Sequence, residues 1–353
     1  MYFALLDFLR FLAAFSVMAF HYYGASNPVG SSLASYYLSY GFLGVELFFI
    51  ISGFVIYFSL RRPLPEYALG RFMRLYPLFW VICTFTYVLT IFFDPNHLGF
   101  TRYLINLLVI NDGKVAYLVD GVYWTLTMEI IFYALIGVFA WLFSTRRLEW
   151  FYAGWLAFSF LVFFFGLQNV FITKILLARY VPYFAFGGML ALIYESWKGA
   201  HLWQKIRQAF ILISAALLPL YISMVLVGDY THRTNLFGFF DKYSSVAVEA
   251  LFVLVPIAVY LSAYVTAPRI LRLAKIAGGI TYPLYLLHEK VGEIIINMIG
   301  KYGVFNLASA SVALGMVGVC YVIYIYEERW RKAAMKRILN TRYFSRPVAS
   351  DLP

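Results

Sequence analysis

The chain has 353 residues, of which 63% are hydrophobic and only 13% are charged, and its formal net charge is +11. Soluble domains carry about a quarter charged residues, so this composition excludes a soluble protein and indicates an integral membrane protein. The positive charge does not indicate nucleic-acid binding, because the basic residues lie in short loops between apolar segments and in the C-terminal tail.

Long apolar segments follow one another along almost the whole chain, which predicts an all-α, polytopic membrane protein with about ten transmembrane helices. The predicted spans are 3–23, 41–60, 75–93, 124–143, 150–168, 180–197, 208–228, 244–265, 279–299 and 306–326. The segment 103–110 is too short to cross a bilayer and is interpreted as interfacial or re-entrant. We expect one transmembrane domain at 1–328, with no appended soluble domain, and a basic tail at 329–353.

Arginine and lysine concentrate in alternate loops, which predicts the orientation of the spans. The richer set of loops holds Arg61, Arg62, Arg71, Arg74, Arg146, Arg147, Lys198, Lys205, Arg207, Arg269, Arg272 and Lys275. The tail is also strongly basic. Both termini are therefore predicted to be cytoplasmic. The first apolar segment lacks a basic leader and is interrupted by Arg10, so we expect a retained span rather than a cleaved signal peptide.

The first predicted span carries ionisable residues on one face. Arg10 and His21 are eleven positions apart, which places them within about 20° of each other around a helix and about 16 Å apart along its axis. Asp7 shares this face. A structural salt bridge is the alternative, but ionisable groups inside a bilayer are costly and typically functional.

The predicted orientation of each span gives the depth of its polar residues in the bilayer. Glu46 and Glu129 fall in the outer third of their predicted spans, at the expected depth of His21, and His288 falls about 14 Å into its span, near the midplane. A histidine beside a carboxylate is typical of general-base chemistry, so His21 with Glu129 or Glu46 is a candidate catalytic group. A structural role for Glu46 remains the alternative.

Arg71 and Arg74 lie three residues apart at the inner end of the third predicted span and would share a helix face. Paired arginines bind phosphate through forked hydrogen bonds, although arginines also flank spans for topological reasons. Tyr285 lies on or near the face of His288, and ordinary salt bridges are expected for the charged residues at 289–293. The two cysteines, Cys83 and Cys320, lie in apolar runs and predict neither a disulfide nor a metal site.

Five motifs in this order resemble the membrane acyltransferase-3 family of O- and N-acyltransferases. They are Arg10 with His21, FFIISGF at 48–54, Arg71-x-x-Arg74 before Pro77, YWTLTMEIIFY at 123–133 and ITYPLYLLH at 280–288. The resemblance implies transfer of an acyl group, commonly acetyl, from cytoplasmic acyl-CoA. It implies an acceptor hydroxyl on a sugar or lipid-linked glycan outside the inner membrane, and a multi-pass protein of that membrane.

The resemblance also implies roles for individual residues. Arg10, His21, Arg71 and Arg74 match positions that are critical in the family, and Trp124 and Glu129 match its tryptophan-to-glutamate stretch. Two departures are visible: Gly70 replaces an arginine that often precedes Arg71, and Glu289 follows the late histidine where glutamine or an apolar residue before proline is common. Many relatives also carry a periplasmic esterase-like domain, which we do not expect in this chain.

The sequence therefore predicts an inner-membrane acyltransferase with acyl-CoA as donor substrate and no permanently bound cofactor or metal. We expect His21, with Glu129 or Glu46, to be catalytic, and Arg10, Arg71, Arg74, Trp124, Tyr285 and His288 to bind substrate. Direct transfer is favoured over an acyl-enzyme, because no activated serine or cysteine is visible near His21. The alternatives are a proton-coupled secondary transporter, which uses similar intramembrane groups, and a lipid-binding structural membrane protein.

Overall fold

The computed structural model describes residues 2–23, 38–109, 115–167, 172, 176–196, 243–300 and 305–340. These residues form helices and turns, with no β-strand among them. The α-helices are α1 (Ala4–Tyr23), α3 (Gly44–Ser59), α4 (Leu64–Phe93), α5 (Phe100–Leu107), α6 (Trp124–Phe143), α7 (Leu148–Phe164), α8 (Val181–Ser196), α10 (Tyr243–Ser262), α11 (Pro268–Leu287), α12 (Lys290–Gly300) and α13 (Phe305–Leu339). Short 3-10 turns lie at Ser39–Leu43, Val115–Tyr117, Gly121–Tyr123 and Thr145–Arg147.

Six helical segments of the described chain are long and apolar enough to cross a membrane. They are Ala4–Tyr23, Tyr40–Ser59, Leu64–Phe93, Gly121–Phe143, Pro268–Leu287 and Leu307–Leu339. Predicted spans at 150–168, 180–197 and 244–265 correspond to α7, α8 and α10, which are not among these six segments, and the predicted span at 208–228 lies outside the described residues. The short helix α5 occupies the segment expected not to cross, and the predicted boundary at 328 falls inside α13.

The ninth predicted span is wrong in its bounds. The sequence predicted one helix at 279–299, but α11 begins at Pro268 and ends at Leu287, and α12 begins only at Lys290. Proline suits the first turn of a helix, which explains the earlier start. The polar residues His288 and Glu289 lie in the break between the two helices. His288 is therefore at the end of a span, not near its middle.

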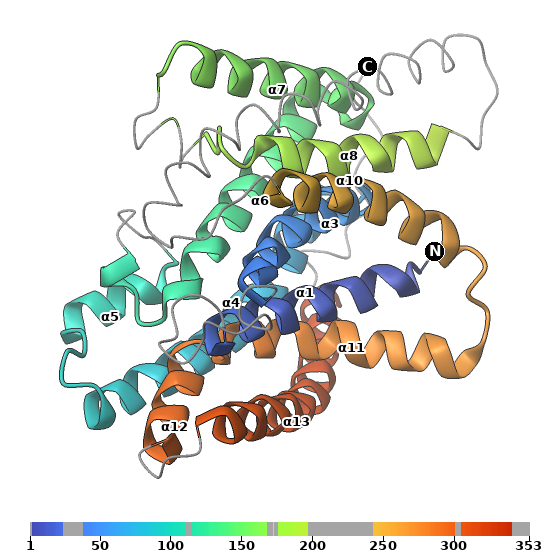
Figure 1. Ribbon diagram of the computed structural model, residues 1–353. Coiled ribbons are helices and arrows are strands. Elements are labelled where there is room, and N and C mark those ends of the chain that lie inside the picture. The colour runs from blue at the N-terminus through green and yellow to red at the C-terminus, as the bar shows by residue number, and fades with distance from the viewer. Residues whose placement is uncertain are drawn as a thin grey trace.

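Helix α1 lies at the centre of the molecule, between α3 and α10 on one side and α11 and α13 on the other (Figure 1). Its first half contributes Leu6 and Leu9 to a core formed with α3, α6, α7, α8 and α10. Its second half contributes Val17 and Met18 to a second core formed with α4, α11 and α13. The two cores thus fix both ends of the helix that carries Arg10 and His21.

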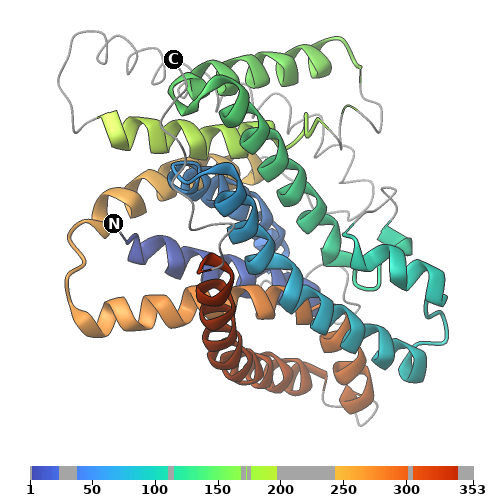
Figure 2. The same ribbon diagram turned by 180° about the vertical axis from the view of Figure 1, so that it is seen from behind.

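Close packing supports this arrangement. A side chain at Gly53 of α3 would lie 2.1 Å from the carbonyl oxygen of Phe184, and one at Gly187 of α8 would lie 1.9 Å from that of Ile50. Small residues let the backbones of two helices approach closely, which is a common means of association inside membranes. Seen from behind, α4 and α6 run beside each other, and α13 bends as it passes α11 and reaches α1 (Figure 2).

Candidate functional site

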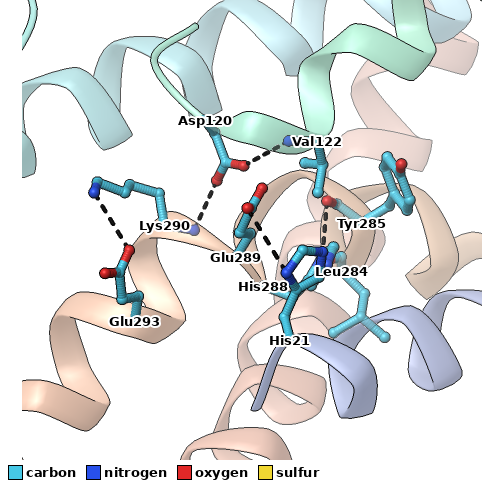
Figure 3. Close-up of polar contacts among 9 residues, drawn as sticks. All are labelled: His21, Asp120, Val122, Leu284, Tyr285, His288, Glu289, Lys290 and Glu293. Atoms are coloured by element: carbon cyan, nitrogen blue, oxygen red, sulfur yellow. Dashed lines mark hydrogen bonds and ion pairs between the residues drawn. The ribbon is translucent and has the colours of Figure 1, made fainter. Parts of the chain in front are cut away.

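His21 and His288 form a histidine pair at the ends of two central helices. His21 lies in the last turn of α1, and His288 follows the last residue of α11. Their ring centroids are 5.2 Å apart. His21 and His288 therefore lie at the same depth, which corrects the expectation that His288 is deeper. Figure 3 shows the pair together with the break between α11 and α12.

The carboxylate beside His21 belongs to Glu289. Its Oε1 is 3.7 Å from Nδ1 of His21, and the two side chains are 27% and 25% exposed. The distance is longer than that of an ordinary hydrogen bond. A carboxylate at Nδ1 favours the tautomer with the proton on that nitrogen, which leaves Nε2 free to accept a proton.

The hydrogen bonds of His288 fix its tautomer. Nδ1 lies 3.2 Å from the carbonyl oxygen of Leu284 and 2.9 Å from that of Tyr285. Carbonyl oxygens only accept, so Nδ1 must carry the hydrogen and Nε2 must present a lone pair. Nε2 is buried and has no hydrogen-bond partner among the described residues. Two neutral imidazoles can thus each present a basic nitrogen at this end of the bundle.

Asp120 lies in the loop before α6, close to Glu289 and to the start of α12. Its Oδ1 accepts the backbone N–H of Val122 at 3.1 Å, and its Oδ2 accepts that of Lys290 at 2.9 Å (Figure 3). Its carboxyl also lies beside that of Glu289. Burial, followed by the charge of Glu289, raises the pKa of Asp120 well above its ordinary value. These surroundings therefore favour the protonated form of Asp120.

Gly121 makes this contact possible. A side chain there would place its Cβ 2.6 Å from Oε2 of Glu289. The next residue outward, Lys290, contacts Oδ2 of Asp94 at 2.8 Å and Oε2 of Glu293 at 3.3 Å. The hydrogen bond from Lys290 holds the pKa of Asp94 below its ordinary value. This ion pair joins the end of α4 to the start of α12.

A cavity of about 60 Å³ lies deeper in the bundle, toward the start of α1. Its polar lining consists of Arg10, Ser52, Arg74, Thr125, Glu129, Thr281, Tyr282 and Tyr285. Ser52 donates a hydrogen bond of 3.0 Å to Glu129, and the hydroxyl of Tyr133 donates to the same carboxylate oxygen. Arg10 contacts Asp7 at 3.4 Å. The cavity thus combines arginines with a carboxylate that accepts two hydrogen bonds on one of its oxygens.

Tyr285 separates this cavity from the histidine pair. Its hydroxyl accepts a hydrogen bond of 2.9 Å from Thr125, and its ring centroid is 5.6 Å from that of His288. The ring of Phe48 packs on Tyr285 at 5.5 Å. Tyr285 therefore both lines the arginine-lined cavity and contacts a member of the histidine pair.

The structure groups the residues that the sequence singled out into two neighbouring sites. Arg10, Arg74, Glu129 and Tyr285 line the cavity, whereas His21 and His288 form the pair beyond it. Glu129 faces the cavity rather than His21, and Glu46 is buried near the start of α3.

Two other predicted residues do not line the cavity. The guanidinium of Arg71 lies 5.4 Å from the centre of the Tyr133 ring, and Trp124 packs against Tyr180 at 5.5 Å. A shared helix face therefore did not bring both arginines into one cavity.

Sequence reasoning did not assign a role at the site to Glu289 or Asp120. The sequence did contain a signal for Glu289, namely its unexpected position directly after His288. Asp120 precedes the tryptophan-to-glutamate motif by a few residues, but nothing in the pattern marked its contact with Glu289. No group of three or more metal-ligating side chains occurs among the residues the structure describes.

The helices, the buried ionisable groups and the two linked sites define a multi-pass membrane protein with an internal site for polar substrates. A family model described as an acyltransferase domain, Acyltransferase 3, matches residues 3–325. The chain belongs to the acyltransferase-3 family and is a membrane acyltransferase; a proton-coupled transporter is not favoured. No curated protein and no solved structure matches the chain.

Proposed function

We propose that the protein transfers an acyl group, acetyl in the simplest case, from cytoplasmic acyl-CoA to a hydroxyl of a sugar or glycan at the outer face of the inner membrane. The observation that carries the proposal is the order of the two sites along α1. The arginine-lined cavity lies near Arg10, and the histidine pair lies about 16 Å farther along the helix. This order suits a polyanionic donor entering from one side and an acceptor from the other.

His21 acts as the general base. Its Nε2 takes the proton of the acceptor hydroxyl as the hydroxyl oxygen attacks the thioester carbonyl carbon. The C–S bond breaks, and the CoA thiolate leaves toward the arginines and is then protonated. Glu289 stabilises the imidazolium that forms on His21, because the two groups are 3.7 Å apart. Nε2 of His288 accepts a second hydrogen bond from the acceptor and thereby orients it.

Direct transfer is favoured over an acyl-enzyme. Cys83 and Cys320 are both buried, in the core that α4, α11 and α13 share, and do not lie on either site. Acyl transfer through a covalent intermediate needs a nucleophile activated by a neighbouring base. An acyl-imidazole on His21 is the alternative, and it would give an acylated protein in the absence of acceptor.

Arg10 and Arg74 hold the polar arm of the donor at the cavity. Guanidinium groups suit phosphate and amide oxygens because they donate several hydrogen bonds in fixed geometry. Arg71 supports the cavity indirectly, because its guanidinium lies over the ring of Tyr133, which in turn donates a hydrogen bond to Glu129. Trp124 supports the same wall through its contact with Tyr180.

Sealed vesicles of known orientation test the proposal. Radiolabelled acetyl-CoA supplied on the side of the C-terminal tail should label glycans on the opposite side, and free CoA should appear on the tail side. Transfer that requires both substrates on one side would contradict the proposed topology. A protein that moves the acceptor without cleaving the thioester would contradict the proposed reaction.

A further inference from the structure

A second, larger cavity opens between α1, α4, α11 and α13. Its volume is about 320 Å³, at the lower end of the range of small-molecule sites, about 300–1,000 Å³. The cationic side chains that line it are Arg10, Arg74, Lys275, Arg331 and Lys332. They outnumber the carboxylates in the lining, so the cavity favours an anionic ligand.

The two cavities adjoin. Arg10, Arg74, Gly278 and Tyr282 line both of them. A ligand that fills the larger cavity can therefore extend past the two arginines to Tyr285 and the histidine pair. The arrangement requires a molecule with an anionic end and a slender arm.

Helix α13 supplies cations that can change partners. Nε of Arg331 contacts Glu327 at 2.6 Å, and Nζ of Lys332 contacts Glu328 at 2.6 Å, in both cases one turn apart on the helix. The side chains of Arg331 and Lys332 are 34% and 70% exposed. Ion pairs between exposed side chains one turn apart on a helix are weak, so an incoming phosphate can replace the carboxylates at little cost.

We propose that Lys275, Arg331 and Lys332 bind the phosphates of the donor's nucleotide, so that the enzyme selects a nucleotide-bearing thioester over one without phosphates. The proposal rests on the proposed function and adds the site that recognises the far end of the donor. Arg10 and Arg74 hold the arm between the nucleotide and the thioester, while the cations of α11 and α13 hold the nucleotide.

Comparing acetyl-CoA with acetyl-pantetheine as acyl donor tests the nucleotide site separately from the catalytic residues. Arg331→Gln with Lys332→Gln should raise KM for acetyl-CoA by about tenfold or more, because the variant loses two charge-assisted contacts with phosphate. The kcat at saturation and the KM for acetyl-pantetheine, which has no phosphate, should not change. Arg329→Gln with Lys336→Gln is the matched control, since both exposed cations lie on α13 outside the cavity.

Direct binding distinguishes failure of this proposal from failure of the proposed function. Calorimetry of purified protein with free CoA and with 3′-dephospho-CoA should show tighter binding of CoA, with the difference reduced in the double variant and kept in the control. Equal effects of the double variant on acetyl-CoA and acetyl-pantetheine, or effects equal to the control, would overturn the nucleotide site. Phosphate-dependent binding without any thioester turnover would support the site and contradict the proposed reaction.

Discussion

Removing the charge of Glu289 tests the assignment of the catalytic histidine. In Glu289→Gln the side chain keeps its shape but no longer stabilises the imidazolium that forms on His21. A charge pair at 3.7 Å contributes about 4 kcal/mol at an effective dielectric constant near 20 and about 1 kcal/mol in bulk water. Both side chains are about a quarter exposed, which favours an intermediate value of about 2 kcal/mol, or about 30-fold in kcat.

The assay is the transfer of radiolabelled acetyl from acetyl-CoA to glycans in native envelope vesicles, with CoA release measured in parallel. Glu293→Gln removes the same charge one turn along α12, where the side chain is 56% exposed and contacts Lys290. We expect this control to lose less than about threefold, because exposed pairs contribute little. Equal activities of the two variants, with both proteins folded, would refute the role of Glu289.

Three further predictions concern individual groups. His21→Ala should lower transfer by about 10²-fold or more without preventing insertion or folding, as measured by transfer and by size-exclusion chromatography. Arg74→Lys should raise KM for acetyl-CoA more than Arg71→Lys does, because Arg74 lines both cavities and Arg71 lines neither. Equal KM values of the two variants would contradict this prediction. Asp94→Asn should remove a small stabilisation, under about 1 kcal/mol, because it breaks the contact with Lys290. In the native protein this stabilisation is present above the ordinary pKa of aspartate and is lost as pH falls through the lowered pKa of Asp94. Thermal unfolding at several pH values measures it.

The sequence predicted the class of the fold well because length and hydropathy constrain membrane helices strongly. The pair Arg10 and His21 was recognised because helical periodicity fixes positions on a single helix. Periodicity on one helix says nothing about which other helix faces it. For that reason the sequence assigned Glu129 or Glu46 to His21, whereas the structure places Glu289 beside it.

The position of His288 shows how one boundary affects the rest of the interpretation. A span starting at 279 places His288 about 14 Å into the membrane, whereas a helix starting at Pro268 places it about 30 Å from the start, at the far end. The apolar residues on both sides of the break concealed it from hydropathy. The same shift moves Glu289 to the level of His21, where the structure finds it.

The buried carboxyl of Asp120 offers a test of the proton that its surroundings favour. Asp120 directly precedes the membrane-spanning segment that begins at Gly121. Burial and the charge of Glu289 raise the pKa of Asp120, so the folded protein binds this proton more tightly than the unfolded chain does. Stability should therefore fall as pH rises above the ordinary pKa of aspartate, about 4, toward the raised pKa of the folded state.

Asp120→Asn should flatten this dependence, because the amide does not titrate. It should also lower stability by about 1–3 kcal/mol, since the amide has only one acceptor oxygen for the N–H groups of Val122 and Lys290. Thermal unfolding of purified protein between about pH 4 and 8 measures both effects. Asp94→Asn is the comparison, because Asp94 stabilises in the opposite pH direction. Parallel curves for the native protein and Asp120→Asn would show that the folded protein does not bind a proton at Asp120 more tightly than the unfolded chain does, and would contradict the raised pKa of Asp120.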